Sequence, residues 1–99
     1  MPKQTIEFRY DTQLLIDLNG MDEDETEDLC DDIHDGIADQ FEGDELLCVA
    51  NEDTIKLHFH TNEPWLVLQY CAKRAGENDG EIYDIVVEDM DRQSRGLHG

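Results

Sequence analysis

Residues 54–61 read Thr-Ile-Lys-Leu-His-Phe-His-Thr, in which polar and apolar side chains alternate from Thr54 to His60. Successive side chains of a strand point to opposite faces, so this segment predicts a strand with its three apolar side chains buried. His58 and His60 would then project together from the opposite, more open face. The pattern therefore requires a sheet that is covered on one side, and it puts two imidazoles on the other side.

The remaining segments predict the element order β-α-β-β-α-β. A four-stranded antiparallel sheet with two helices on one face, the ferredoxin-like α+β sandwich, has this split βαβ order. We expect a single domain over residues 1–93 and a flexible tail over residues 94–99. Strands are expected over residues 5–18, 46–50, 54–61 and 81–88, and helices from residue 22 or 24 to about residue 43 and from residue 64 to about residue 76.

The two predicted helices have recognisable buried faces and ends. In the first, Leu29, Ile33 and Ile37 recur at helical spacing. In the second, Pro64 suits the first turn, with Thr61 or Asn62 as the expected cap. Further side chains expected at the buried faces are Cys30, Ala38 and Phe41 in the first helix and Leu66, Val67, Tyr70 and Cys71 in the second.

The chain carries a formal charge of -19 over 99 residues. Phosphates and anionic lipid surfaces would repel such a chain, so nucleic acid and membranes are not expected partners. No apolar run approaches a membrane span of about 20 residues, and the first residues lack the apolar core of a signal peptide, so we expect a cytoplasmic protein. The acidic segment 22–45 fits either a solvated helix face or a docking face for a basic partner.

The three cysteines, Cys30, Cys48 and Cys71, are widely spaced and form no CxxC pair. In a reducing compartment they are expected to pack as small apolar side chains. Nucleotide-binding and acyl-enzyme motifs are absent, and the acidic run from Asp22 has Glu27 where an EF-hand loop needs glycine.

The predicted topology supplies a third ligand beside the histidine pair. The first and third strands of a ferredoxin-like sheet are neighbours, and by strand parity Asp11 shares the open face with His58 and His60. Two histidines and one aspartate suit Zn²⁺ or another divalent transition metal. The competing interpretation is three ordinary polar residues on a solvent-exposed strand face. A metal-bound water would also permit a small hydrolase or transferase.

One family carries this combination of motifs. His58-Phe-His60-Thr-Asn-Glu-Pro64, followed by a helix and by Glu88-Asp-Met-Asp-Arg-Gln93, resembles the domain after the kinase domain in the dihydroxyacetone-kinase-like family of fatty acid kinase A. The strand that starts Tyr10-Asp11-Thr-Gln also resembles that family, which has cysteine at the position of Asp11. The motif positions carried over are Thr61, Asn62, Pro64 and Arg92.

The resemblance implies a metal site at Asp11, His58 and His60, with a hard carboxylate replacing a soft thiolate. It also implies partners: a kinase domain or a DegV-type fatty-acid-binding protein. The ATP-binding part of such kinases has no counterpart here, so we expect a non-catalytic accessory domain that positions or regulates partners. The alternatives are the metal-dependent enzyme and a plain interaction module without metal, and a homodimer through the open sheet face fits all three.

Overall fold

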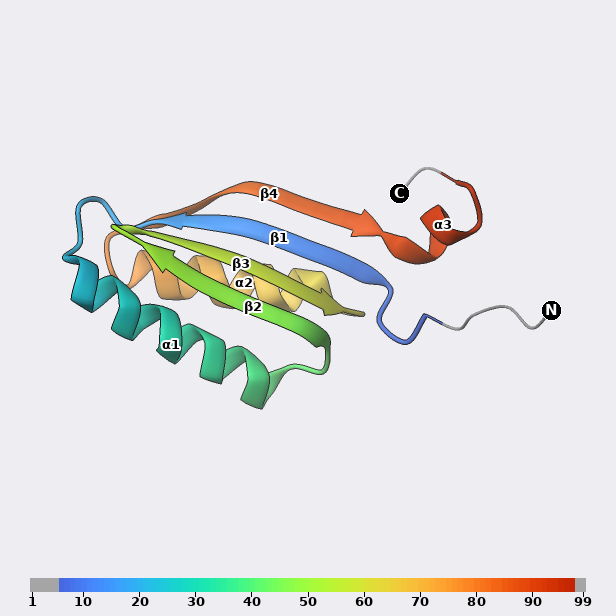
Figure 1. Cartoon of the computed structure of the whole chain (residues 1–99), viewed down its shortest axis with the longest axis horizontal. Helices are drawn as coiled ribbons and strands as arrows, with labels where there is room; N and C mark the ends of the chain where they lie inside the picture. Colours follow the sequence, from blue (N-terminus) through green and yellow to red (C-terminus); the bar gives the residue numbers. More distant parts are fainter. Residues whose placement is uncertain (1–5, 98–99) are drawn as a thin grey trace.

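The computed structural model describes residues 6–97 and confirms the ferredoxin-like α+β sandwich. Its four strands form one antiparallel sheet in the order β2-β3-β1-β4, with β3 and β1 at the centre (Figure 1). The elements are β1 (Tyr10–Asp17), α1 (Glu23–Gln40), β2 (Asp44–Asn51), β3 (Thr54–Thr61), α2 (Pro64–Gly76), β4 (Glu81–Asp89) and α3 (Met90–Ser94).

The alternation in the two central strands separates the faces of the sheet. In β1, buried Thr12, Leu14 and Ile16 alternate with partly exposed side chains, and β3 shows the same pattern. Leu14 pairs with Leu57 across the strands, so the buried sets of β1 and β3 meet on one face. Transfer of one such aliphatic side chain from water contributes about 1.5–3 kcal/mol to folding.

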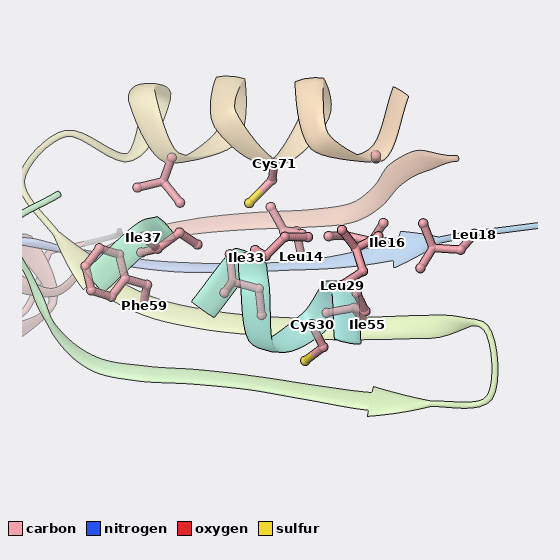
Figure 2. Close-up of a cluster of buried hydrophobic side chains, with 13 residues drawn as sticks. Leu14, Ile16, Leu18, Leu29, Cys30, Ile33, Ile37, Ile55, Phe59 and Cys71 are labelled. Atoms are coloured by element: carbon pink, nitrogen blue, oxygen red, sulfur yellow. The ribbon is translucent and has the colours of Figure 1, made fainter. Parts of the chain in front are cut away.

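Helices α1 and α2 cover this apolar face, and Figure 2 shows the side chains packed between helices and strands. The buried stripe of α1 recurs at helical spacing, as predicted, at Leu29, Ile33 and Ile37. Cys30 joins that stripe, whereas the expected neighbour Ala38 is exposed because it lies on the outer side of the helix. Phe41 is partly buried against Tyr70 in an edge-on ring contact.

Several predicted boundaries were wrong: β2 runs over Asp44–Asn51 rather than 46–50, and α1 ends at Gln40 rather than near residue 43. The first strand begins at Tyr10, so residues 6–9 of the predicted segment precede it, and residue 5 lies outside the described residues. The N-cap of α2 is Glu63, which makes no side-chain capping bond, rather than Thr61 or Asn62. Those two side chains instead bind other backbone groups, described below.

The segment after β4 contains a helix that the sequence patterns did not predict. Residues 90–94 form α3, directly after the last strand. The Asp89 carboxylate caps this short helix by accepting a hydrogen bond from the Arg92 amide at 2.9 Å. An aspartate at this position satisfies an amide that the helix itself leaves unpaired.

The edge strand β2 has an irregularity near its start. Its pairing with β3 shifts register between Asp44 and Leu47, and Glu45 adopts a positive φ of 54°. A bulge of this kind re-aims the side chains around it. Here it leaves Asp44 as the register partner of His60.

Among residues 6–97, none of the helices combines the length and the apolar character that a membrane span requires.

Candidate metal centre

The strand pairing brings the three predicted ligands together. Asp11 on β1 is the register partner of His60 on β3, and His58 lies two residues earlier on the same face of β3. The side chains of Asp11, His60 and His58 are 18, 20 and 27 % exposed respectively, so the cluster is partly sheltered but reachable from solvent. All three lie where β1 begins and β3 ends, at the end of the sheet from which α3 departs (Figure 1).

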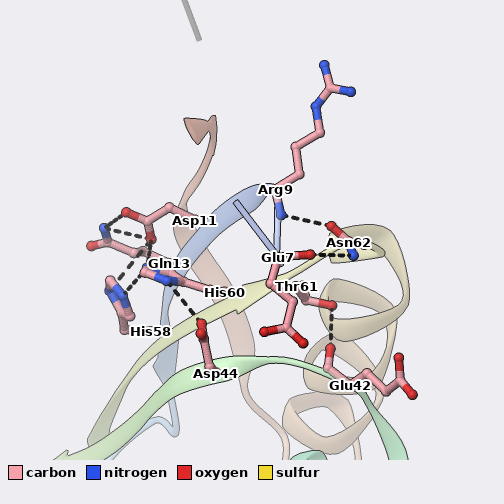
Figure 3. Close-up of polar contacts among 10 residues, drawn as sticks. All are labelled: Glu7, Arg9, Asp11, Gln13, Glu42, Asp44, His58, His60, Thr61 and Asn62. Atoms are coloured by element: carbon pink, nitrogen blue, oxygen red, sulfur yellow. Dashed lines mark hydrogen bonds and ion pairs between the residues drawn. The ribbon is translucent and has the colours of Figure 1, made fainter. Parts of the chain in front are cut away.

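The polar atoms of the three side chains lie close together, as Figure 3 shows. The Nε2 atoms of His58 and His60 are 3.0 Å apart. The Asp11 Oδ1 atom is 3.9 Å from His60 Nε2 and 3.6 Å from His58 Nδ1. One donor atom from each residue can be chosen so that all lie within 4.8 Å of one another.

These spacings suit a small tetrahedral ion. Zinc bonds of about 2.0–2.1 Å to nitrogen and oxygen place ligand atoms roughly 3.4 Å apart around a tetrahedron. The 3.0 and 3.9 Å separations both involve Nε2 of His60 and fall on either side of that value, whereas the 3.6 Å approach to Asp11 is made by the other ring nitrogen of His58, Nδ1. A set of two imidazoles and one carboxylate leaves a fourth position for water or another ligand.

Two further residues contact the candidate ligands, and the sequence patterns did not single them out. Asp44 on β2 lies 3.3 Å from His60 Nδ1, so a proton on Nδ1 would leave Nε2 as the free donor. Gln13 donates from Nε2 to both carboxylate oxygens of Asp11, at 3.3 and 3.4 Å. Carboxylates and amides in these positions commonly hold metal ligands in place. Because of the bulge in β2, the alternation of strand side chains did not predict that Asp44 would lie beside His60.

The motif residues after His60 anchor the strand ends that carry the cluster. Thr61 is buried and donates its hydroxyl to the Glu42 carbonyl at 3.0 Å. Asn62 accepts a hydrogen bond from the Arg9 amide at 2.8 Å and donates to the Glu7 carbonyl at 3.1 Å. Pro64 is buried at the first turn of α2. Thr61, Asn62 and Pro64 therefore support the strand ends beside the cluster.

A second polar cluster fastens the start of β1 to the end of β4. Arg9 Nε and Nη2 lie 2.9 and 2.7 Å from the same oxygen of Asp89. The bond from Arg9 lowers the pKa of the Asp89 carboxyl, and the same pair raises the pKa of Arg9. Arg92 contributes its backbone amide to Asp89. This ion pair links the two strand ends, and the positive charge of Arg9 balances the negative charge of Asp89.

The cysteines lie on the covered side and away from the histidine cluster. Cys30 and Cys71 are buried and Cys48 is partly buried, and all three are free thiols. Burial raises the pKa of each thiol, that of Cys71 to about 12. The expectation of apolar packing is confirmed, and the structure additionally brings Cys30 and Cys48 together.

The fold and the cluster define an α+β sandwich domain with a candidate metal centre on its open face. The family model for the middle domain of FakA-like fatty acid kinase proteins matches residues 7–97. The chain therefore belongs to this family, as the resemblance of its motifs indicated. No curated protein matches the chain.

Proposed function

We propose that this chain is a non-catalytic accessory domain of a fatty acid kinase assembly, which binds a divalent metal through Asp11, His58 and His60. The observation that supports it is the convergence of three donor atoms from two adjacent strands within 4.8 Å. Zinc is the first candidate because imidazole and carboxylate ligands in a tetrahedral set suit it. The metal would lock the ends of β1 and β3 together.

The open face gives this domain a surface for a partner. Leu47 and Val49 on β2 are 54 and 47 % exposed, and Val86 on β4 is 42 % exposed. A hollow of about 530 Å³ on the same face is lined partly by Leu15, Val49 and Lys56. Apolar side chains gathered beside a sheltered polar cluster are typical of an interaction surface. A kinase domain, a DegV-type fatty-acid-binding protein and a second copy of this chain are the partners we propose for it.

Metal analysis of protein purified without an affinity tag tests the ligand set. The expected result is one zinc ion per chain, with at least a hundredfold weaker binding after His58→Ala and His60→Ala together. His34→Ala is the matched control, because His34 lies on α1 and contacts a carboxylate, Asp35, at 3.2 Å. Wild-type protein without stoichiometric metal, or equal affinity in the double variant, would contradict the metal site.

Titration calorimetry with the isolated kinase domain and with a DegV-type protein tests the surface. Val49→Asp should weaken binding by at least tenfold, since it places a charge in the apolar part of the open face. Ala72→Asp, on the exposed side of α2, should leave the affinity unchanged. Sedimentation of the chain alone distinguishes a homodimer from a heteromeric contact. Equal effects of the two variants would place the partner elsewhere on the molecule.

A further inference from the structure

The sulfur atoms of Cys30 and Cys48 lie 3.2 Å apart, although 18 residues separate them in the chain. Cys30 is in the middle of α1, and Cys48 is in the centre of β2, on the side of the strand that faces this helix. The thiol of Cys30 donates to the sulfur of Cys48, and Cys48 donates to the Cys30 carbonyl at 3.4 Å. The gap is about 1.2 Å longer than a covalent S–S bond of about 2.05 Å.

An opening to solvent lies at this pair. A surface hollow of about 190 Å³ is lined by Cys30, Cys48 and Ala50, together with the carboxylates of Glu27 and Asp31. Cys48 is partly exposed, whereas Cys30 is only 4 % exposed. A small reagent would therefore reach Cys48 first, and the two carboxylates favour a reagent that is neutral or positively charged.

We propose that Cys30 and Cys48 form a reversible disulfide that joins α1 to the edge strand β2. The oxidant is a low-molecular-weight disulfide, R–S–S–R. Cys48 loses its proton and attacks one sulfur, so the R–S–S–R bond breaks, a Cys48–S–S–R bond forms and one R–SH leaves. Cys30 then attacks the sulfur of Cys48 and releases the second R–SH. Two electrons pass from the protein thiols to the reagent, and the two thiol protons leave with the two R–SH molecules.

The surroundings of the two cysteines make disulfide formation depend on the supply of oxidant. Burial raises the pKa of both thiols, and the charges of Asp31 and Glu27 add to the effect at Cys30. Thiolates are the reactive form, so both cysteines stay reduced unless an oxidant accumulates. The bond would close a loop that includes the end of α1 and the bulge beside Asp44. Oxidation would thus stiffen the strand that supports His60.

Treatment of the reduced chain with cystamine, a disulfide with two ammonium groups, tests the proposal. The expected product is a single chain that has lost two hydrogens, with the peptides of Cys30 and Cys48 linked until dithiothreitol is added. Closing a loop of this length should raise the thermal midpoint by roughly 12–25 °C. A stable cysteamine adduct on wild-type Cys48, a link to Cys71, or a link between two chains would overturn it.

Two alanine variants separate the steps and a third serves as the control. Cys30→Ala should hold the reaction at the cysteamine adduct of Cys48, because the resolving thiol is gone. Cys48→Ala should react at least tenfold more slowly than Cys30→Ala, since Cys30 is shielded. Cys71→Ala should form the Cys30–Cys48 link like the wild type. Formation of the adduct at equal rates in the first two variants would refute the assigned order of attack.

Discussion

The two faces of the sheet differ although the same strands build both. On the covered face, β3 contributes Ile55, Leu57 and Phe59 to a core that excludes water. On the open face, the alternating positions of that strand hold His58 and His60 near partly exposed carboxylates. One face therefore provides folding free energy, and the other carries the candidate metal site. Because strand side chains alternate, each function can be altered with little effect on the other.

The largest expected difference between the faces is in the free energy of unfolding. Substitutions at two neighbouring residues of β3, one on each face, test it. Leu57→Ala should cost about 2–5 kcal/mol in the free energy of unfolding, because a fully buried side chain leaves a cavity. Lys56→Ala should change it by no more than about 0.5 kcal/mol, because Lys56 is exposed on the open face. Urea unfolding followed by circular dichroism measures both. Similar losses in the two variants would mean that the open face also carries core packing.

On the open face, the contact between Asp44 and His60 can be tested separately from the three candidate ligands. Asp44→Asn should weaken metal binding by about 10–100-fold, since the amide orients the Nδ1 proton of His60 less firmly. Asp35→Asn is the control, because Asp35 contacts His34 on the outer surface of α1 in a similar pair. Competition with a zinc-binding dye gives both affinities. An unchanged affinity in Asp44→Asn would remove Asp44 from the site.

Two buried threonines refine the description of the covered face. Thr61→Val should destabilise the fold by about 1–2 kcal/mol, because the hydroxyl of Thr61 bonds to Glu42 and also accepts from the Glu63 amide at 3.3 Å. Thr12→Val should stabilise it by about 1 kcal/mol, because the Thr12 hydroxyl finds no hydrogen-bond partner among residues 6–97. Thermal unfolding of the two variants compares them directly. A loss of stability in Thr12→Val would indicate a partner that these residues do not show.

The smallest effect concerns the polar tie between Arg9 and Asp89, and it depends on pH. The native pKa of Asp89 is lowered, so its contribution is complete above the unfolded value of about 3.9 and is lost as the pH falls below it. Arg9→Gln should therefore be less stable than the wild type at pH 7 and equally stable near pH 2. Arg95→Gln, which removes an exposed pair with Asp91 at 3.1 Å, is the control. A difference that persists in acid would show that Arg9 acts through packing.

Sequence patterns predicted most of the fold and the three ligands of the candidate site. The strand at residues 54–61 was predicted to the residue because its side chains alternate from Thr54 to His60 and residues typical of turns flank both ends. The start of β1 was missed because the alternation continues into residues 6–9, where β3 has already ended and Asn62 binds the backbone instead. The cap of α2 was missed for a related reason, since the side chains of Thr61 and Asn62 bond to backbone groups far away in the chain.

Strand parity was sufficient to place Asp11 with the histidines, because a period of two and a known strand order leave one arrangement. The position of Asp44 and the pairing of Cys30 with Cys48 could not follow from any local pattern. The position of Asp44 depends on a bulge that changes the register of the edge strand β2. The pairing of the two cysteines depends on the position along β2 at which α1 packs. Such distances are set by packing between elements distant in the chain, where local periodicity carries no information.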